Sequence, residues 1–371
     1  MGCCGSRNGF ACRGTADVKR RARIRRCRAR AVVLAFLVAG LVAACAPAGS
    51  DGDSAAAFDA RPLDAPATVV IGLYPSITVL PLYVAQERGY FAAERLDVQT
   101  PLSKSSVDSM PLLAAGRMDG FVSAPSPSFI NSVHNGVQAK FVASFGNPRP
   151  GGPNSAFVAK NAGPVTDVAS LRGRRIAVGN GKADAAAFML AELLKQGNLT
   201  MDDVQLVDVD LAESVTALEN GSVDAAYVLG VTAVDLRNAG THVVLGDMDA
   251  VLAQGTGAGI IFGSRLLDHD TRVGAAFLRA IRRGAQDLQG DYMNDPQITA
   301  ILARAMRLPA EALRKQGPVA PVVSTDMAIG TSFFERMQQY FVDAGVIPPG
   351  RAIALDQAFD QRFVDAMRTA G

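Results

Sequence analysis

Residues 71–91, IGLYPSITVLPLYVAQERGYF, decide the expected fold of this 371-residue chain. The apolar run before Tyr74 is of strand type, and a short polar loop separates it from Pro81. Pro81 opens a stretch with helical apolar spacing and Gly89 closes it, which matches the preference for proline at helix starts and glycine just past helix ends. A strand, a loop and a helix in this order direct free backbone N–H groups above the loop, where an anionic or polar small molecule can bind.

Strand-type and helix-type segments alternate from residue 68 onward, which is typical of a parallel α/β sheet. A turn-rich break at 147–153 separates two such units, and extended runs at 156–159 and 257–263 can cross between them. The chain after residue 263 is expected to be helical. We expect strands at 69–73, 96–99, 120–123, 139–144, 175–178, 204–209, 225–229 and 242–245, and helices at 82–88, 106–115, 127–135, 184–196, 212–220, 271–288, 296–306, 326–344 and 355–367.

A shift of the sequence by 105 residues superimposes parts of the two units. It aligns two copies of the pattern Leu-x-x-Gly-x-x-Asp, which begin at Leu113 and Leu218, each at a helix end before an apolar strand. The same shift places residues 74–78 on 179–183. Two anchors with one offset indicate two lobes of the same plan. Chance similarity between helix ends is the alternative, since Val98 does not keep the register.

The net charge of +2 conceals a basic N-terminal segment and an acidic remainder. Residues 1–44 contain Lys19 and nine arginines against Asp17, so they carry +9 and the remainder carries −7. Because the remainder has no basic stripe, the asymmetry indicates export and not nucleic-acid binding. The basic stretch 19–30 precedes the 14 uncharged residues 31–44, fewer than a membrane span needs, as in a secretory signal.

Cys45 ends the sequence Leu-Val-Ala-Ala-Cys, which resembles a bacterial lipobox, so we expect a diacylglyceryl group on its thiol. An ordinary signal peptide that ends near a cysteine is the alternative. All five cysteines lie at or before Cys45, so the body has no disulfide, thiolate metal site or cysteine nucleophile. We expect a signal peptide at 1–44, a flexible tether at 45–65, a first lobe at 66–155 with 264–371, and a second lobe at 156–263.

Two long stretches carry a family resemblance. GLYPSITVLPLYVAQERGYFAAERLDVQ, residues 72–99, resembles the opening of substrate-binding proteins of ABC importers, in the nitrate, sulfonate, taurine and thiamine-precursor group. SLRGRRIAVGNGKADAAAFMLAELLKQGNLTMDDVQLVDV, residues 170–209, resembles their second lobe. The resemblance implies an α/β fold of the two-lobed, periplasmic-binding-protein-like type II, with two hinge crossings and a helical C-terminal region. Its lobes would close on a ligand about a hinge near 153–160 and 257–264.

The resemblance implies ligand contacts in loops after strands of both lobes, and the 105-residue pairing groups the same loops, 74–78, 123–126, 179–184 and 229–232. The candidate ligand-binding residues are Tyr74, Ser76, Thr78, Ser123, Ser126, Asn180, Gly181, Lys182, Asp184 and Leu229. Structural roles are the alternatives. Thr78 and Ser126 can cap helices, Asp184 suits the positive end of a helix, and Tyr74 can pack on the core.

The loop 179–184, GNGKAD, lacks the serine or threonine with which many relatives hold a sulfonate or similar oxyanion at this helix start. A simple sulfonate or nitrate ligand is therefore in doubt. Lys182 can pair with an anion, and Asp184 can hold an amine or a ring N–H. The three histidines lie far apart with no metal-binding spacing, so we expect neither a metal nor a cofactor.

These features predict an exported, monomeric solute-binding protein, lipid-anchored to the cell membrane and facing the outside or the periplasm. It would capture a small polar or heteroaromatic molecule between its lobes and deliver it to an ABC permease and ATPase, with no nucleic acid as partner. An enzyme of the same fold, like a pyrimidine synthase or a menaquinone-pathway enzyme, is the alternative, as is a ligand sensor. The lack of body cysteines and of a His/Asp/Glu cluster disfavours catalysis.

Overall fold

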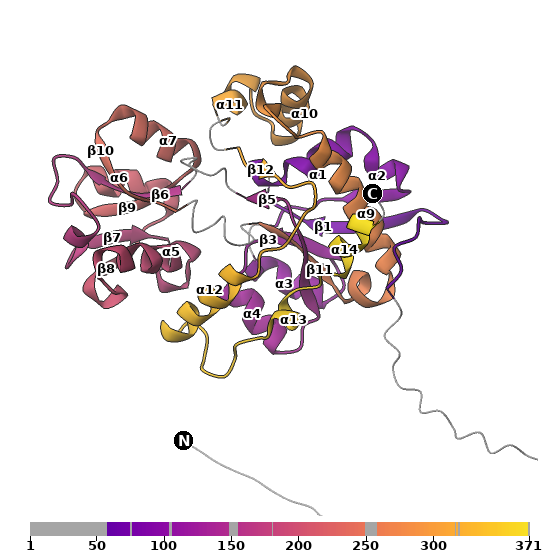
Figure 1. The fold of residues 1–371 in the computed structure, drawn as a ribbon, viewed down its shortest axis with the longest axis horizontal. Helices are drawn as coiled ribbons and strands as arrows, with labels where there is room; N and C mark the ends of the chain where they lie inside the picture. Colours follow the sequence, from indigo (N-terminus) through magenta and orange to yellow (C-terminus); the bar gives the residue numbers. More distant parts are fainter. Residues whose placement is uncertain are drawn as a thin grey trace, which may run out of the picture. The chain divides into compact units, whose positions relative to one another are not determined.

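The computed structural model describes residues 58–74, 76–103, 106–147, 155–179, 181–248, 258–315, 317 and 320–369 (Figure 1). The expected signal peptide, Cys45 and Asn180 lie outside these residues. In the part of the chain that is described, no helix is both long and apolar enough to cross a membrane.

Two five-stranded sheets and a two-stranded one organise the described chain. The first sheet contains β1 (Ala67–Gly72), β2 (Leu96–Gln99), β3 (Gly120–Ser123), β4 (Ala139–Ser144) and β11 (Gly259–Gly263). The second contains β6 (Ser155–Lys160), β7 (Arg175–Val178), β8 (Gln205–Asp208), β9 (Ala225–Leu229) and β10 (His242–Asp247), and the small one pairs β5 (Gly146–Asn147) with β12 (Val322–Val323).

Helices connect and cover the strands. They are α1 (Leu80–Glu87), α2 (Tyr90–Ala93), α3 (Ser106–Ala114), α4 (Pro127–His134), α5 (Ala185–Leu194), α6 (Ser214–Glu219), α7 (Gly230–Ala239), α9 (Thr271–Gln286), α10 (Pro296–Met306), α11 (Ala310–Lys315), α12 (Ser332–Asp343), α13 (Leu355–Ala358) and α14 (Arg362–Thr369). Most expected segments are confirmed within a few residues. Helices α2, α7 and α11 were not expected from the sequence.

The two large sheets share one topology. Their strand orders are β2-β1-β3-β11-β4 and, read from the other end, β8-β7-β9-β6-β10. In each sheet the first three strands are parallel, and the fourth, β11 or β6, runs antiparallel to both of its neighbours. Ile71 faces Gly120 in the first sheet, and Ile176 faces Ala225 in the second, so the 105-residue offset holds in the strand register.

The aspartate that ends each repeated pattern performs the same task in both sheets. The Asp119 carboxylate accepts a hydrogen bond from the backbone N–H of Val70 at 2.8 Å, and that of Asp224 accepts one from Arg175 at 2.9 Å. The backbone N–H groups of both aspartates in turn donate to the carbonyl oxygens of Val70 and Arg175. Each carboxylate therefore fixes the pairing of two parallel strands, and the internal repeat is confirmed.

One apolar cluster joins elements of both sheets through α12. The cluster contains Phe121 of β3, Phe157 of β6 and Phe188 of α5, together with Phe333 and Phe334 of α12, all of them buried. The Phe334 ring contacts Phe359 edge-on at 5.1 Å, whereas the Phe333 ring contacts Phe188 edge-on at 5.1 Å. Helix α12 thus packs on α4 with one face and on α5 with another.

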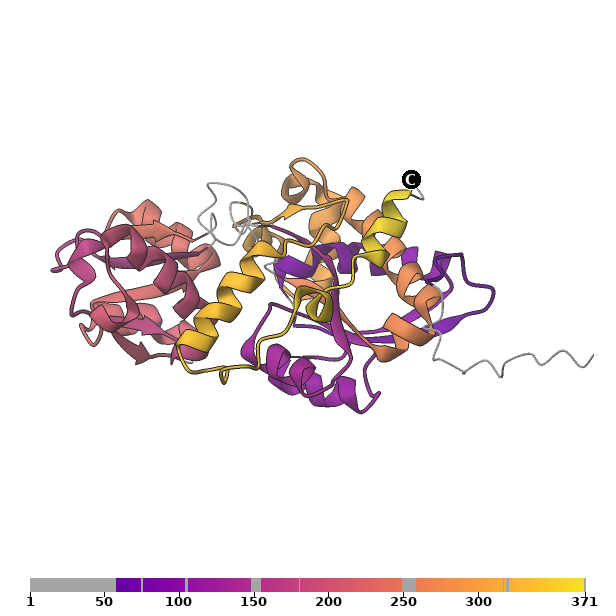
Figure 2. The same cartoon turned by 60° about the horizontal axis from the view of Figure 1, so that its bottom comes forward.

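The described end of the expected tether packs on the folded chain. Phe58 makes an edge-on contact with Phe363 of α14 at 4.9 Å, and the Asp59 N–H donates to the Thr271 hydroxyl at 3.0 Å. Arg272 of α9 forms ion pairs with Asp59 and, at 3.0 Å, with Asp64. Helix α14 lies beside α9 (Figure 2). Residues 58–64 therefore belong structurally with these two helices.

Two helix predictions near the C-terminal end were partly wrong. The helix expected at 326–344 begins only at Ser332, because Met327 has a positive φ of 51° and the Asp326 carboxylate accepts from the Ala328 N–H. The helix expected at 355–367 is two helices. Phe359, between them, is in extended conformation and forms a bridge with Phe141 of β4.

Candidate functional site

Two of the expected loops leave the same edge of the first sheet. Strands β1 and β3 are parallel neighbours, so residues 74–78 and 123–126 both follow carboxyl ends of strands. Tyr74 does not pack on the core, because 57% of its surface is exposed. The hydroxyls of Ser76 and Thr78 lie 2.6 Å apart and hydrogen-bond to each other. Thr78 caps no helix, since α1 starts at Leu80 and its N-cap is Val79.

Serine hydroxyls continue along this edge. Ser126 accepts from the Phe129 N–H at 3.3 Å, so its expected role as a cap, of α4, is confirmed. Ser123 shares a 2.9 Å hydrogen bond with Ser106, the buried first residue of α3. Sequence reasoning missed Ser106. Ser106 begins the helix that follows β2, and a hydroxyl at such a helix start is the signal that would have identified it.

The two remaining loops leave one edge of the second sheet, because β7 and β9 are also parallel neighbours. Gly181 has a φ of 56°, which a side chain would strain, and Lys182 beside it is exposed. The Asp184 carboxylate caps α5 by accepting from the Ala186 N–H at 2.7 Å. Leu229 is the N-cap of α7, so residues 230–232 form the first helical turn and not a loop.

Large exposed apolar side chains in the described chain gather beyond the carboxyl ends of strands. Three come after β1 or β2 of the first sheet, and two lie at or after the ends of strands of the second sheet. The sixth lies on β12, which pairs with β5, the strand just after β4. They are Tyr74, Leu102, Val107, Leu211, Leu229 and Val322. Sequence reasoning named only Tyr74 and Leu229. Leu102, Val107 and Leu211 come after the ends of strands, which is the pattern that would have identified them, whereas Val322 lies on β12.

The chain path brings these two edges within reach of each other. Strand β11 pairs Gly259 with Ser123 and Ser144, so it begins at the carboxyl edge of the first sheet. Strand β6 pairs Ser155 with Leu229, so it begins at the corresponding edge of the second sheet. Both connections between the sheets therefore run from one carboxyl edge to the other. The first spans only 147–155, roughly 29 Å at full extension.

Electrostatic coupling connects the second-sheet edge to α12. Burial raises the pKa of the Tyr340 hydroxyl to about 12, and the negative charge of Asp184 adds to the shift. Among the described residues, no three or more histidine, cysteine, aspartate or glutamate side chains are placed to hold a metal ion. The candidate residues supply hydroxyls, the Lys182 cation, the Asp184 carboxylate and apolar surface, which suits recognition of a small molecule with both polar and apolar parts.

Comparisons with known proteins agree with this architecture. The chain is 26% identical over 270 residues to the riboflavin-binding protein RibY of Chloroflexus aurantiacus, covering 70% of this chain and 74% of RibY. The periplasmic aliphatic sulphonate binding protein SsuA from Escherichia coli has a similar structure, with a TM-score of 0.62, 18% identity, and coverage of 80% of this chain and 93% of SsuA. The desulfurization enzyme DSZB also shares the fold, with a TM-score of 0.55, 15% identity, and coverage of 81% and 99%.

These matches confirm the expected two-lobed fold of periplasmic binding proteins, since the topology of both sheets and the likeness to SsuA agree. The family is shown separately, by sequence. A model of the NMT1/THI5-like family matches residues 76–297, more than half of the chain, and the protein belongs to this family.

Proposed function

We propose that this protein is an exported solute-binding protein of an ABC importer, which captures a planar heteroaromatic molecule with polar edges. Riboflavin or a related flavin is the first candidate. The observation that carries the proposal is the set of exposed apolar side chains at and beyond the strand ends, three of them after β1 or β2 of the first sheet and two at or after the ends of β9 and β8 in the second. Apolar surface left in water at the place where such folds bind ligands is best explained by an apolar ligand face.

The polar groups nearby fit the edges of a flavin. Hydroxyls of Ser76, Thr78 and Ser123 can donate to or accept from ring carbonyl and nitrogen atoms. Asp184 can accept from a ring N–H, and Lys182 can donate to a carbonyl. The similarity to RibY supports a flavin, and the missing serine or threonine in 179–184 speaks against a sulfonate.

The same proposal covers export and delivery. The basic and apolar segments in residues 1–44 and the lipobox-like sequence at Cys45 support lipid anchoring outside the cytoplasm. A monomer would hand its ligand to a permease and its ATPase after closing about the two connections. Catalysis is not proposed, although DSZB shares the fold, because the cysteines all lie at or before Cys45. Product formed from bound ligand by the purified protein would overturn this view.

Riboflavin fluorescence gives a direct test. We expect the purified protein to quench riboflavin fluorescence saturably, and riboflavin to raise the melting temperature because it binds the folded state. Tyr74→Ala should weaken binding about tenfold through loss of ring stacking, and Tyr74→Phe, which keeps the ring, should stay within about twofold. A rise in melting temperature with nitrate or a sulfonate, and none with riboflavin, would refute the flavin assignment.

A further inference from the structure

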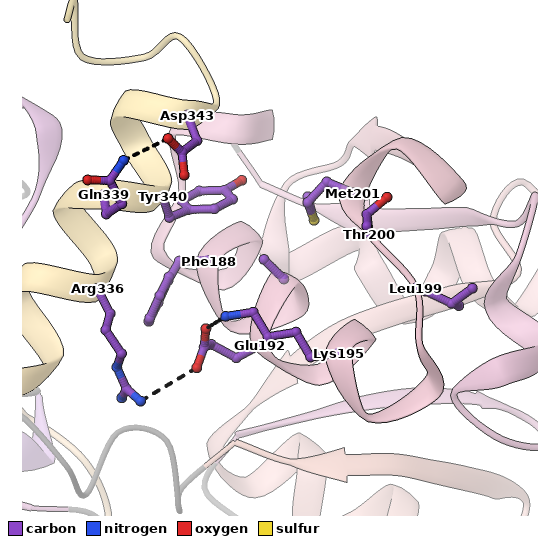
Figure 3. A pocket seen from close by; sticks show the side chains of 11 residues that line it. Phe188, Glu192, Lys195, Leu199, Thr200, Met201, Arg336, Gln339, Tyr340 and Asp343 are labelled. Atoms are coloured by element: carbon purple, nitrogen blue, oxygen red, sulfur yellow. Dashed lines mark hydrogen bonds and ion pairs between the residues drawn. The ribbon is translucent and has the colours of Figure 1, made fainter.

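A cavity of about 350 Å³ lies between α5 and α12 (Figure 3). Its walls come from α5, from the turns that follow it, and from one face of α12. None of its lining residues belongs to the four strand-end loops. An adjoining hollow shares Met201, Tyr340 and Asp343 with it and reaches Lys182 of the loop 179–184. The lining residues used below are Phe188, Ala191, Glu192, Lys195, Leu199, Met201, Arg336, Gln339, Tyr340 and Asp343.

The interior of this cavity is apolar and aromatic. Phe188 is 1% exposed and Leu199 is 4% exposed, so both form its buried wall. The Tyr340 ring contacts the Phe188 ring edge-on at 5.9 Å. Met201 lies across the space from Tyr340, as Figure 3 shows. A volume of about 350 Å³ with such walls is at the lower end of the range for small-molecule pockets, about 300–1,000 Å³.

One buried polar atom in this cavity has no hydrogen-bond partner within the described chain, the hydroxyl oxygen of Tyr340. A buried hydroxyl without a partner is unfavourable, because it has lost its hydrogen bonds to water. Burial raises its pKa to about 12, so the hydroxyl keeps its proton and remains a donor at neutral pH. Because this oxygen is buried, a ligand that offers an acceptor would satisfy it after a neighbouring side chain moves aside.

The charged groups at the rim compensate one another. Glu192 forms ion pairs with Lys195 and, at 3.7 Å, with Arg336. The Asp343 carboxylate accepts from the Gln339 amide at 2.7 Å. Two cations and two anions thus border the cavity, and neither sign is left in excess. A charged ligand would gain no net attraction here, whereas an uncharged one would lose no hydration of an ion.

We propose that this cavity is a second small-molecule site, for an uncharged aromatic molecule of one or two rings that carries a hydrogen-bond acceptor. The ring would lie against Phe188, Leu199 and Met201, and the acceptor would receive the Tyr340 hydroxyl proton. This proposal does not depend on the transport function, because it uses none of the strand-end residues.

Benzamide is a suitable probe, since it is uncharged and has one ring and a carbonyl. Its binding to the full chain can be followed by titration calorimetry and ligand-observed NMR. We expect saturable binding, weakened about fivefold to tenfold by Tyr340→Phe, which removes one hydrogen bond and fills no space. Tyr90→Phe removes a tyrosine hydroxyl elsewhere, one that donates to Asp287, and should leave benzamide affinity unchanged.

Two further variants locate the site. Ala191→Leu places a larger side chain in the cavity and should abolish benzamide binding, with circular dichroism confirming that the variant is folded. Tyr74→Ala, at the strand-end site, should leave it unchanged. Absence of saturable binding to the wild type would overturn the proposal, as would loss of binding in Tyr74→Ala or full binding in both cavity variants.

Discussion

The two lobes share a backbone plan and differ in the chemistry that they present beyond their strands. In both, an aspartate at the end of the same pattern fixes two parallel strands, through Val70 in the first lobe and Arg175 in the second. The first lobe then presents an aromatic ring and several hydroxyls, whereas the second presents Lys182, Asp184 and aliphatic side chains. The framework is thus constrained by hydrogen bonds, and the loops are free to vary with the ligand.

The contacts of these two aspartates, Asp119 and Asp224, are not identical. Asp119 is 7% exposed and also pairs with Arg265 of the segment after β11 at 2.8 Å. The Asp224 carboxylate forms its ion pair, at 3.3 Å, with the side chain of Arg175, and it also accepts its backbone hydrogen bond from Arg175. The Arg175 side chain is 43% exposed. Asp119 therefore connects three segments that are distant in the sequence, whereas Asp224 connects two.

The largest difference should appear when the two carboxylates are removed. Asp119→Ala should lower the free energy of unfolding by about 3 kcal/mol, because the partly buried Val70 N–H loses its acceptor and Arg265 loses one of its two carboxylate partners. Asp224→Ala should lower it by about 1–2 kcal/mol, because the exposed Arg175 guanidinium can hydrogen-bond to water instead. Urea denaturation measures both, and equal losses would show that the third segment adds nothing.

A smaller contrast lies at the paired positions Gly120 and Ala225. A Cβ on Gly120 would lie 2.4 Å from the carbonyl oxygen of Ile261, so Gly120→Ala should destabilise by about 2 kcal/mol. The equivalent residue of the second lobe already carries a Cβ, and Ala225→Gly should cost about 1 kcal/mol. Thermal melting of both variants tests this order, and a stable Gly120→Ala variant would contradict it.

The caps of α5 and α4 should differ less in their contributions to the free energy of unfolding. Asp184→Ala removes the 2.7 Å cap of α5 and should cost about 1 kcal/mol, while Asp184→Asn, which keeps a capping oxygen, should cost less. Ser126→Ala removes the longer, 3.3 Å cap of α4 and should cost about 0.5 kcal/mol. Urea titrations of the three variants decide this, and a larger loss in Ser126→Ala would reverse the order.

The smallest expected effect is the loss of the stability contributed by Asp224 at acidic pH. Burial alone would raise the pKa of Asp224, but its hydrogen bonds and charge interaction with Arg175 lower the net pKa below 3.8. A lowered carboxyl pKa stabilises the fold above the unfolded value and loses this contribution as the pH falls through the folded value. The stability advantage of the wild type over Asp224→Asn should therefore hold well above pH 3.8 and shrink below it. An advantage that persists in stronger acid would contradict the assignment.

Much of the fold was accessible from the sequence because its local signals agree with its tertiary structure. The apolar strands and the repeated Leu-x-x-Gly-x-x-Asp pattern predicted both sheets, and the one-residue register change at Val98 is real: β1 pairs Val70 with Gln99, while β7 pairs Arg175 with Gln205. Helix α7 was missed because its apolar periodicity is weak. The turn at Met327 was missed because a positive φ there depends on contacts made by Asp326.

The candidate site was less accessible. Strand ends located its loops, and the caps at Ser126 and Asp184 followed from capping preferences. The bond between Ser123 and Ser106, and the exposure of Leu102 and Val107, depend on how α3 meets the sheet. Strand ends indicate where such residues lie, but which hydroxyls pair and which side chains stay exposed depends on tertiary contacts. Asn180 and Cys45 remain predictions.

The antiparallel strand in each sheet has a consequence for how the protein can be divided. Strand β11 follows the second unit in sequence but lies between β3 and β4 of the first sheet, and β6 lies between β9 and β10 although it follows the first unit. The two halves have in effect exchanged strands, as in a domain-swapped dimer joined into one chain. A continuous fragment of residues 58–147 would therefore lack β11 of its own sheet, whereas a continuous fragment of residues 155–248 would contain all five strands of the second sheet.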